Sequence, residues 1–182
     1  YRSNKLCLFE VILVALTIQW GELTAAKKPL QLSGSVDLAE AVKERADLVD
    51  AGPLHVQVQA TYSSGVARVQ GEAEAEFKFQ CSRCLEPFKK RIRFPLREMF
   101  TKDKSILEAE TEDLIHLVGT DEIDLAPVAR ENALLELPIA PICQEHCAGL
   151  CPVCGQNLNE ATCGCEREQI DPRLAGLKDF FK

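Results

Sequence analysis

Eight cysteines in this 182-residue sequence stand at spacings that suit metal ligation. They form one early CxxC pair and a later group of six: Cys81, Cys84, Cys143, Cys147, Cys151, Cys154, Cys163 and Cys165. A CxxC turn aims two sulfurs at one point, and four thiolates complete one tetrahedral zinc site. The set therefore predicts two structural Zn²⁺ ions, whereas Cys7 has no partner by spacing.

The order of these cysteines indicates how they divide between two sites. The last four, from Cys151 to Cys165, lie within 15 residues, and Gly155 permits the positive φ that such a knuckle needs. The other four, Cys81, Cys84, Cys143 and Cys147, would then join two distant segments. The alternative is an interleaved division, in which Cys143, Cys147, Cys151 and Cys154 share a site. His146 is expected to face solvent rather than to bind metal.

The ligand set also bears on the class of activity. An all-sulfur site leaves no open coordination position, so we expect structural rather than hydrolytic zinc. Ser, His and Asp form no recognisable catalytic order, and no glycine-rich phosphate loop occurs. We therefore expect a protein that is not an enzyme and has no small-molecule substrate. Two alternatives use the same cysteines: a rubredoxin-like iron protein, or a thiol redox switch that releases zinc on oxidation.

A local basic stretch is the strongest signal for a partner. The chain has a net charge of -7, yet residues 78–104 hold nine Lys and Arg against three Asp and Glu, locally +6. The candidate RNA-binding residues are Lys89, Lys90, Arg91, Arg93 and Arg97. On a strand, Lys89, Arg91 and Arg93 would project from one face and could follow a phosphate backbone. An ordinary solvated sheet face is the competing interpretation.

Alternation of apolar and polar residues predicts that strands carry this stretch. Residues 54–60 alternate with period two, as do residues 71–81 and 88–100, and Ser63 to Gly65 marks a turn. Helices are expected at residues 38–45 and from Asp124 to about Leu137, the latter with Leu125, Val128, Asn132 and Leu135 on one stripe. The fold class is α+β, an antiparallel meander with a few short helices and a cysteine-rich C-terminal zinc-knuckle segment.

The N-terminal stretch allows three interpretations. Residues 6–20 are largely apolar, follow Arg2 and Lys5, and contain Glu10. They could be a signal segment, a buried or amphipathic element, or upstream sequence that is foreign to the native protein. We favour the third interpretation and expect three parts in the chain. They are a non-native or disordered extension at 1–18, an α+β core at 19–142, and a zinc-binding segment with a last helix at 143–182.

The combined motifs resemble those of the bacterial YceD family. The resemblance rests on Cys81-Ser-Arg-Cys84-Leu-Glu-Pro-Phe88, Glu122-Ile-Asp-Leu125, Leu134-Leu-Glu-Leu-Pro138 and the stretch from Cys143 to Cys165, and it runs from about Gln19 to the C-terminus. Some relatives keep the equivalents of the first four cysteines but lack the last four, which supports two separable sites. Relatives also tend to begin near Gln19, which leaves residues 1–17 outside the match.

This resemblance implies a function in the cytoplasm. It implies a factor in large ribosomal subunit assembly, 23S ribosomal RNA processing and accumulation. The expected partners are large-subunit ribosomal RNA or a precursor particle, with a ribosomal protein as a further candidate, and no membrane. The resemblance identifies no RNA-binding residue, so the basic residues above remain an inference from charge and strand phase.

Overall fold

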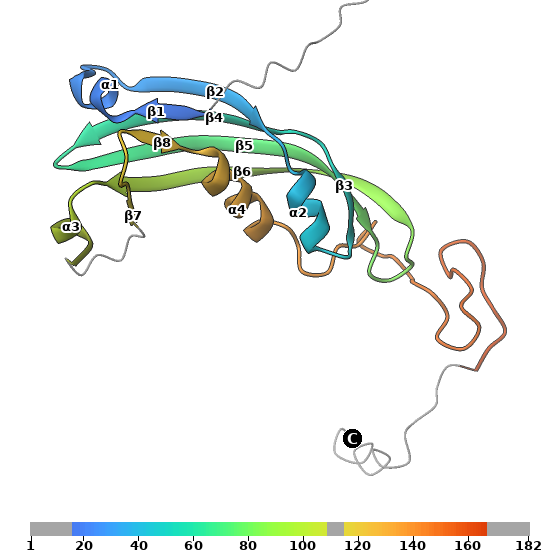
Figure 1. Ribbon diagram of the computed structural model, residues 1–182. Coiled ribbons are helices and arrows are strands. Elements are labelled where there is room, and N and C mark those ends of the chain that lie inside the picture. Colours follow the sequence, from blue (N-terminus) through green and yellow to red (C-terminus); the bar gives the residue numbers. More distant parts are fainter. Residues whose placement is uncertain (1–15, 109–114, 167–182) are drawn as a thin grey trace, which may run out of the picture.

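The chain forms a strand-rich fold with a few short helices (Figure 1). The structure is a computed structural model that describes residues 16–108 and 115–166. The strands are β1 Thr17–Gln19, β2 Leu30–Val36, β3 Leu48–Ala51, β4 Leu54–Ser63, β5 Val66–Gln80, β6 Pro87–Thr101, β7 Ile115–Leu117 and β8 Glu122–Asp124. The helices are α1 Trp20–Ala25, α2 Ala39–Glu44, α3 Lys104–Glu108 and α4 Ala126–Leu135. None of the helices in these ranges is both long and apolar enough to cross a bilayer.

Six of the strands form one twisted sheet in the order β2-β4-β5-β6-β7, and β3 pairs with β5 beyond the start of β4. The expected antiparallel meander describes β4, β5 and β6, which follow one another directly. The sheet as a whole is mixed rather than antiparallel throughout, because β7 joins β6 in parallel. A parallel pair needs a crossover connection of about a dozen residues or more, and residues 102–114, which include α3, supply that length.

The β4–β5 hairpin fixes the register on which the candidate interface depends. Its two-residue turn, Ser64 and Gly65, has positive φ at both positions, as a type I′ turn requires. β5 and β6 are each 15 residues long and pair along their whole length, from Val66 opposite Thr101 to Gln80 opposite Pro87. The side chains of β5 and β6 are therefore aligned row by row across the sheet.

One face of the sheet is covered and the other is open. α2 and α4 lie against the same face (Figure 1), and the inward residues of β4, β5 and β6 are buried beneath them. Small side chains, Ala129 and Ala133, form the buried face of α4. The expected stripe is wrong at Leu135, which is 77% exposed, because alanine on the opposite side lets the helix backbone approach the sheet.

The expected boundary of the N-terminal extension is also wrong. Thr17 to Gln19 form β1, which pairs antiparallel with β8, and Leu16 and Ile18 are buried in the core. Residues 16–18 are therefore part of the fold, because apolar side chains at alternate positions complete the core beside Ile123 and Leu125. Residues 1–15 of the predicted extension and the predicted last helix lie outside the described residues.

Candidate metal centres and nucleic-acid interface

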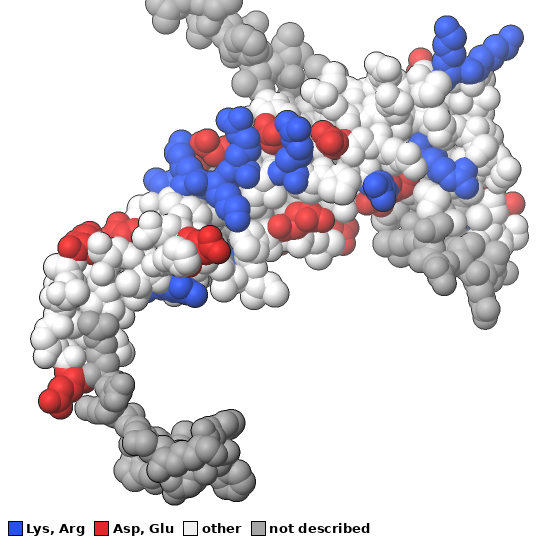
Figure 2. All heavy atoms as spheres, turned by 180° about the vertical axis from the view of Figure 1, so that it is seen from behind, with Lys and Arg blue, Asp and Glu red and all other residues white. Residues whose placement is uncertain are grey.

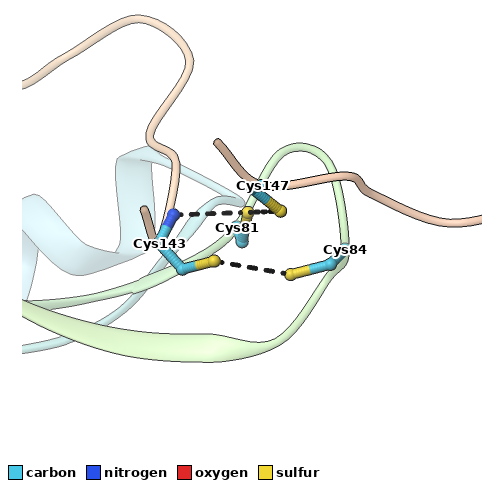
Figure 3. A group of neighbouring side chains, drawn as sticks. All are labelled: Cys81, Cys84, Cys143 and Cys147. Atoms are coloured by element: carbon cyan, nitrogen blue, oxygen red, sulfur yellow. Dashed lines mark hydrogen bonds between the residues drawn. The ribbon is translucent and has the colours of Figure 1, made fainter. Parts of the chain in front are cut away.

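The first cysteine group joins the end of the sheet to the segment after α4 (Figure 3). Cys81 and Cys84 follow β5, and their sulfurs meet those of Cys143 and Cys147. The Cys81 and Cys147 sulfurs are 3.8 Å apart, and those of Cys84 and Cys143 are 3.7 Å apart. Cys81, Cys84 and Cys147 are buried and Cys143 is partly exposed, so this group, named site one here, is largely shielded from solvent.

A tight knuckle positions the first two sulfurs of site one. The Leu85 amide donates to the Cys81 carbonyl at 2.9 Å, and the Cys81 amide donates to the Glu86 carbonyl at 2.9 Å. Leu85 has a φ of 61°, a conformation that non-glycine residues rarely adopt. The Ser82 amide donates to the Pro141 carbonyl at 2.8 Å, so the knuckle also holds the segment that carries Cys143.

The second group, site two, repeats this knuckle. The Gly155 amide donates to the Cys151 carbonyl at 2.9 Å, and the Cys151 amide donates to the Gln156 carbonyl at 2.8 Å. Gly155 has a φ of 76°, so glycine stands here where Leu85 stands in site one. The four sulfurs, those of Cys151, Cys154, Cys163 and Cys165, lie within 4.8 Å of one another. The structure thus groups the cysteines by the first division rather than the interleaved one, and His146 is exposed outside both groups.

Asn159 connects the two sites, and the spacing of the cysteines gave no sign of this. Its side-chain amide donates to the Cys147 sulfur at 3.3 Å, and its side-chain oxygen accepts from the Ala148 amide at 2.8 Å. A bridge between Leu150 and Asn157 runs alongside. Asn159 follows Cys154, so a residue within the span of site two orients a ligand of site one.

Hydrogen bonds to sulfur favour thiolates within each group. Burial alone would raise the pKa of Cys81, but backbone amides, including those of Arg83 and Cys143, outweigh it and lower the pKa to about 6. The backbone amides of Cys154 and Val153 likewise lower the pKa of Cys151 to about 6. Each group therefore holds a sulfur that is anionic at neutral pH.

Other cysteines hold their protons more tightly. Burial and the neighbouring sulfurs raise the pKa of Cys143 to about 12. Hydrogen bonding with Cys154, together with burial, raises the pKa of Cys165 to about 12. Four thiolates within contact distance repel one another, so full ionisation of either group needs a cation among the sulfurs.

The donor set and its dimensions fit zinc. A tetrahedral ion with Zn–S bonds of about 2.3 Å sets its sulfurs about 3.8 Å apart. The two sulfur pairs of site one are already at this separation. Site one would be a buried cross-link between β5 and the segment after α4. Site two would be a more open one, because Cys154 is exposed and Cys163 and Cys165 are partly exposed.

The predicted RNA-binding residues all lie on β6 but do not share one face. Lys89, Arg91, Arg93 and Arg97 are exposed on the open face of the sheet. Lys90 is exposed too, but it follows the phase of Phe88 and Ile92, which pack against the core. It therefore points to the covered side, at the free edge of β6, where an inward charge discourages edge-to-edge pairing.

An acidic row on β5 pairs with the basic residues on the open face. Lys89 contacts Glu76 at 2.8 Å. Arg91 lies 3.8 Å from Glu74, and Arg93 contacts Glu74 at 3.0 Å and Glu72 at 3.8 Å. The cations still project, with 65–69% of each side chain exposed. We call these six residues the charged ladder, and Figure 2 shows basic and acidic side chains interleaved on this side.

The charged ladder could have been predicted from the sequence. Glutamates at 72, 74 and 76 and basic residues at 89, 91 and 93 share the phase that faces away from the phenylalanines. Consecutive antiparallel strands place such rows side by side. By contrast, Arg97 stands opposite Gln70 and has no carboxylate partner among residues 16–108 and 115–166.

A family model places the chain in a known family. The model described as "Large ribosomal RNA subunit accumulation protein YceD" matches residues 69–181, more than half of the sequence. The chain belongs to the YceD family. The match covers both cysteine groups and the charged ladder. No solved structure matches this YceD-family chain.

Relatives of this YceD protein occur in bacteria and plants. An uncharacterized protein of Mycobacterium tuberculosis is 40% identical over 120 residues, which cover 65% of this chain and 57% of the relative. The Bacillus subtilis relative YlbN, also uncharacterized, is 29% identical over 86% of this chain and 90% of its own length. A chloroplast protein of Arabidopsis thaliana, named large ribosomal RNA subunit accumulation protein YCED homolog 1, is 26% identical over 71% of this chain and 49% of the relative. The alignments thus span little more than half of the mycobacterial relatives.

Proposed function

We propose that this protein is a non-enzymatic cytoplasmic factor in large ribosomal subunit assembly, where it supports processing and accumulation of 23S ribosomal RNA. Its family and its plant relatives carry the name of large ribosomal RNA accumulation. The observation that carries the proposal is the charged ladder: cations aligned on an open sheet face of an otherwise acidic chain. RNA or a precursor particle would be the partner, and a ribosomal protein could share the surface.

The cations of the charged ladder suit a regulated contact with phosphate. Lys89, Arg91 and Arg93 keep about two thirds of their side-chain surface exposed, so a phosphate can approach without displacing the protein core. Exposed ion pairs contribute about 0–1 kcal/mol each, so exchanging a glutamate for a phosphate costs little. The glutamates also lower the net attraction for RNA, which favours a defined binding site over indiscriminate adsorption.

Zinc would act as structural support for this surface. Site one would hold the end of β5, and hence the start of β6, against the segment after α4. Structural zinc contributes about 10 kcal/mol or more in small modules, comparable to the whole stability of a domain. The all-sulfur ligand sets leave no open coordination position, in keeping with a role other than catalysis.

The test of RNA contact is reversal of charge on the ladder. Arg91→Glu with Arg93→Glu should weaken association with large-subunit precursors about tenfold or more, because repulsion replaces two phosphate contacts. The measurement is co-sedimentation of the full chain with precursor particles on gradients. Lys27→Glu with Lys28→Glu is the matched control, since it makes the same charge change at exposed positions between α1 and β2. Equal association of the ladder variant and the wild type would refute this contact.

Elemental analysis separates this proposal from the electron-transfer alternative. The reduced, purified protein should hold about two zinc ions per chain, one for each group of four cysteines. A red, iron-loaded protein would favour the rubredoxin-like alternative. Retention of zinc through cycles of mild oxidation would argue against a thiol switch.

A further inference from the structure

A groove crosses the open face of the sheet beside the charged ladder. Its floor is the backbone of three neighbouring residues, Leu32 on β2, Val58 on β4 and Gly71 on β5. The hollow has a volume of about 680 Å³ and is lined by polar side chains on both sides. Leu32 and Val58 turn their side chains to the core, and Gly71 has none, so no apolar side chain projects into the groove from its floor.

The register of the sheet builds the first wall. Gln31 stands opposite Gln59, Gln59 opposite Gln70, and Gln70 opposite Arg97. We call these four residues the glutamine row. At about 4.8 Å per strand, it extends about 14 Å across four strands and ends on a guanidinium. The second wall has Ser33, Gln57 and Glu72 in the same order.

The glutamine row offers hydrogen-bonding groups that the protein does not use. The side chains of Gln31, Gln59 and Gln70 are exposed and make no hydrogen bond within the described part of the chain. Each amide has two donor hydrogens and an acceptor oxygen, and it can pair with two atoms on the edge of a base such as adenine. Arg97, the row's only cation, is likewise free of a carboxylate among those residues and can bind a phosphate.

We propose that this groove binds single-stranded RNA, which would run across the β-strands of the sheet. The glutamine amides would hydrogen-bond to base edges, and Arg97 would bind a phosphate. The inference rests on the proposed function and specifies where bases, rather than phosphates alone, would be contacted. A duplex fits this chemistry less well, because the major groove of an A-form helix is too deep and narrow for side chains to reach its base edges. Its shallow minor groove is recognised mainly through shape, 2′-hydroxyls and phosphates. A peptide fits less well, since peptide recognition draws on apolar anchors and the walls supply none.

The charged ladder continues this surface. Arg93 and Arg97 project from the same face of β6 on either side of Pro95, so the two phosphate contacts would flank one end of the groove. Glu72, in the second wall, lies 3.8 Å from the Arg93 guanidinium, which offsets part of its repulsion for a phosphate. Between the charged groups this side of the molecule carries uncharged side chains (Figure 2).

The test compares two exposed glutamines on the same face of β5, Gln70 in the groove and Gln80 outside it. Binding of the full, metal-loaded chain to short labelled adenylate and uridylate single strands, and to a duplex of equal length, is measured by fluorescence anisotropy. Gln70→Leu should weaken single-strand binding roughly tenfold and leave the salt dependence unchanged, because an amide neutralises no phosphate. Gln80→Leu should bind as the wild type does. Arg97→Gln should weaken binding and reduce the salt slope by about one.

Several results would overturn the inference. They are unchanged binding by Gln70→Leu, equal loss in Gln70→Leu and Gln80→Leu, or a wild-type preference for the duplex. Loss of precursor association by Gln70→Leu without loss of RNA binding would instead assign the groove to a ribosomal protein. If Gln70→Leu fails to fold, Gln70→Met decides in its place, because it keeps the length of the side chain and adds no charge. Two results together would support the groove and refute the proposed function. These are RNA binding that depends on Gln70, and no association of the wild type with precursor particles.

Discussion

Replacing Gly71 with alanine should disrupt the sheet at its centre. A Cβ built on Gly71 would lie 2.6 Å from the Val58 Cα and 2.9 Å from the Gln57 carbonyl carbon, and closer still to the Gln57 oxygen. Real Cβ atoms essentially never come within 3.0 Å of another heavy atom. The obstructing atoms belong to the backbone of β4 and cannot rotate aside, so the substitution must push β4 and β5 apart.

The size of the effect follows from what this separation breaks. Overpacking in a dense region costs about 1–3 kcal/mol. Separating the strands at this point would cost about two ladder hydrogen bonds, each contributing about 1 kcal/mol. Alanine also lowers the conformational entropy of the unfolded chain, which offsets about 0.5–1 kcal/mol of this loss. Gly71→Ala should therefore lower the free energy of unfolding by about 2–4 kcal/mol, and the melting temperature by roughly 5–15 °C.

Equilibrium denaturation with circular dichroism measures this loss, with zinc held constant. Gly119→Ala is the matched control, since a Cβ there meets nothing within 4 Å, and it should change stability by less than about 0.5 kcal/mol. If Gly71→Ala were as stable as the control variant, the close approach of β4 and β5 described above would be wrong. The floor of the groove would then need another explanation.

Two further predictions concern the charged ladder and the metal sites. Glu74→Gln removes the carboxylate shared by the two arginines of the ladder, so RNA affinity should rise and the salt slope should steepen by about one; weaker binding in a salt titration would contradict this. Cys84→Ser and Cys154→Ser should each remove about one of two zinc ions. Only Cys84→Ser should lower the stability of the sheet, by about 3 kcal/mol or more, because Cys84 is 4% exposed and lies at the end of β5, whereas Cys154 is exposed. Zinc content and thermal melts distinguish the two variants, and equal destabilisation would refute the difference in role.

Strand phase along β4, β5 and β6 could be predicted from the sequence. Leu54, Val56 and Val58 are buried as their alternation indicates, and so are Phe77 and Phe79. The Ser64–Gly65 turn and the two knuckles were also predictable, because glycine and CxxC spacings report local backbone geometry. Neighbouring residues along the chain decide all of these features.

Other elements depended on contacts between distant segments. The pairing of Thr17–Gln19 with Glu122–Asp124 could not be predicted, since each strand has only three residues and the two are far apart in the chain. The buried side of α4 was misjudged at Leu135, because the space beneath a helix, rather than its largest side chains, decides which face turns inward.

The sequence by itself determined which cysteines are candidate metal ligands, the strand phases and the local excess of positive charge. The tertiary structure decided which sulfurs meet, that three cations of β6 stand beside glutamates, and that three glutamines and Arg97 form one row across four strands. The reason is physical. Periodicity and turn chemistry act over a few residues, whereas these groupings need loop closure and cross-strand register, which place residues far apart in the chain within contact distance.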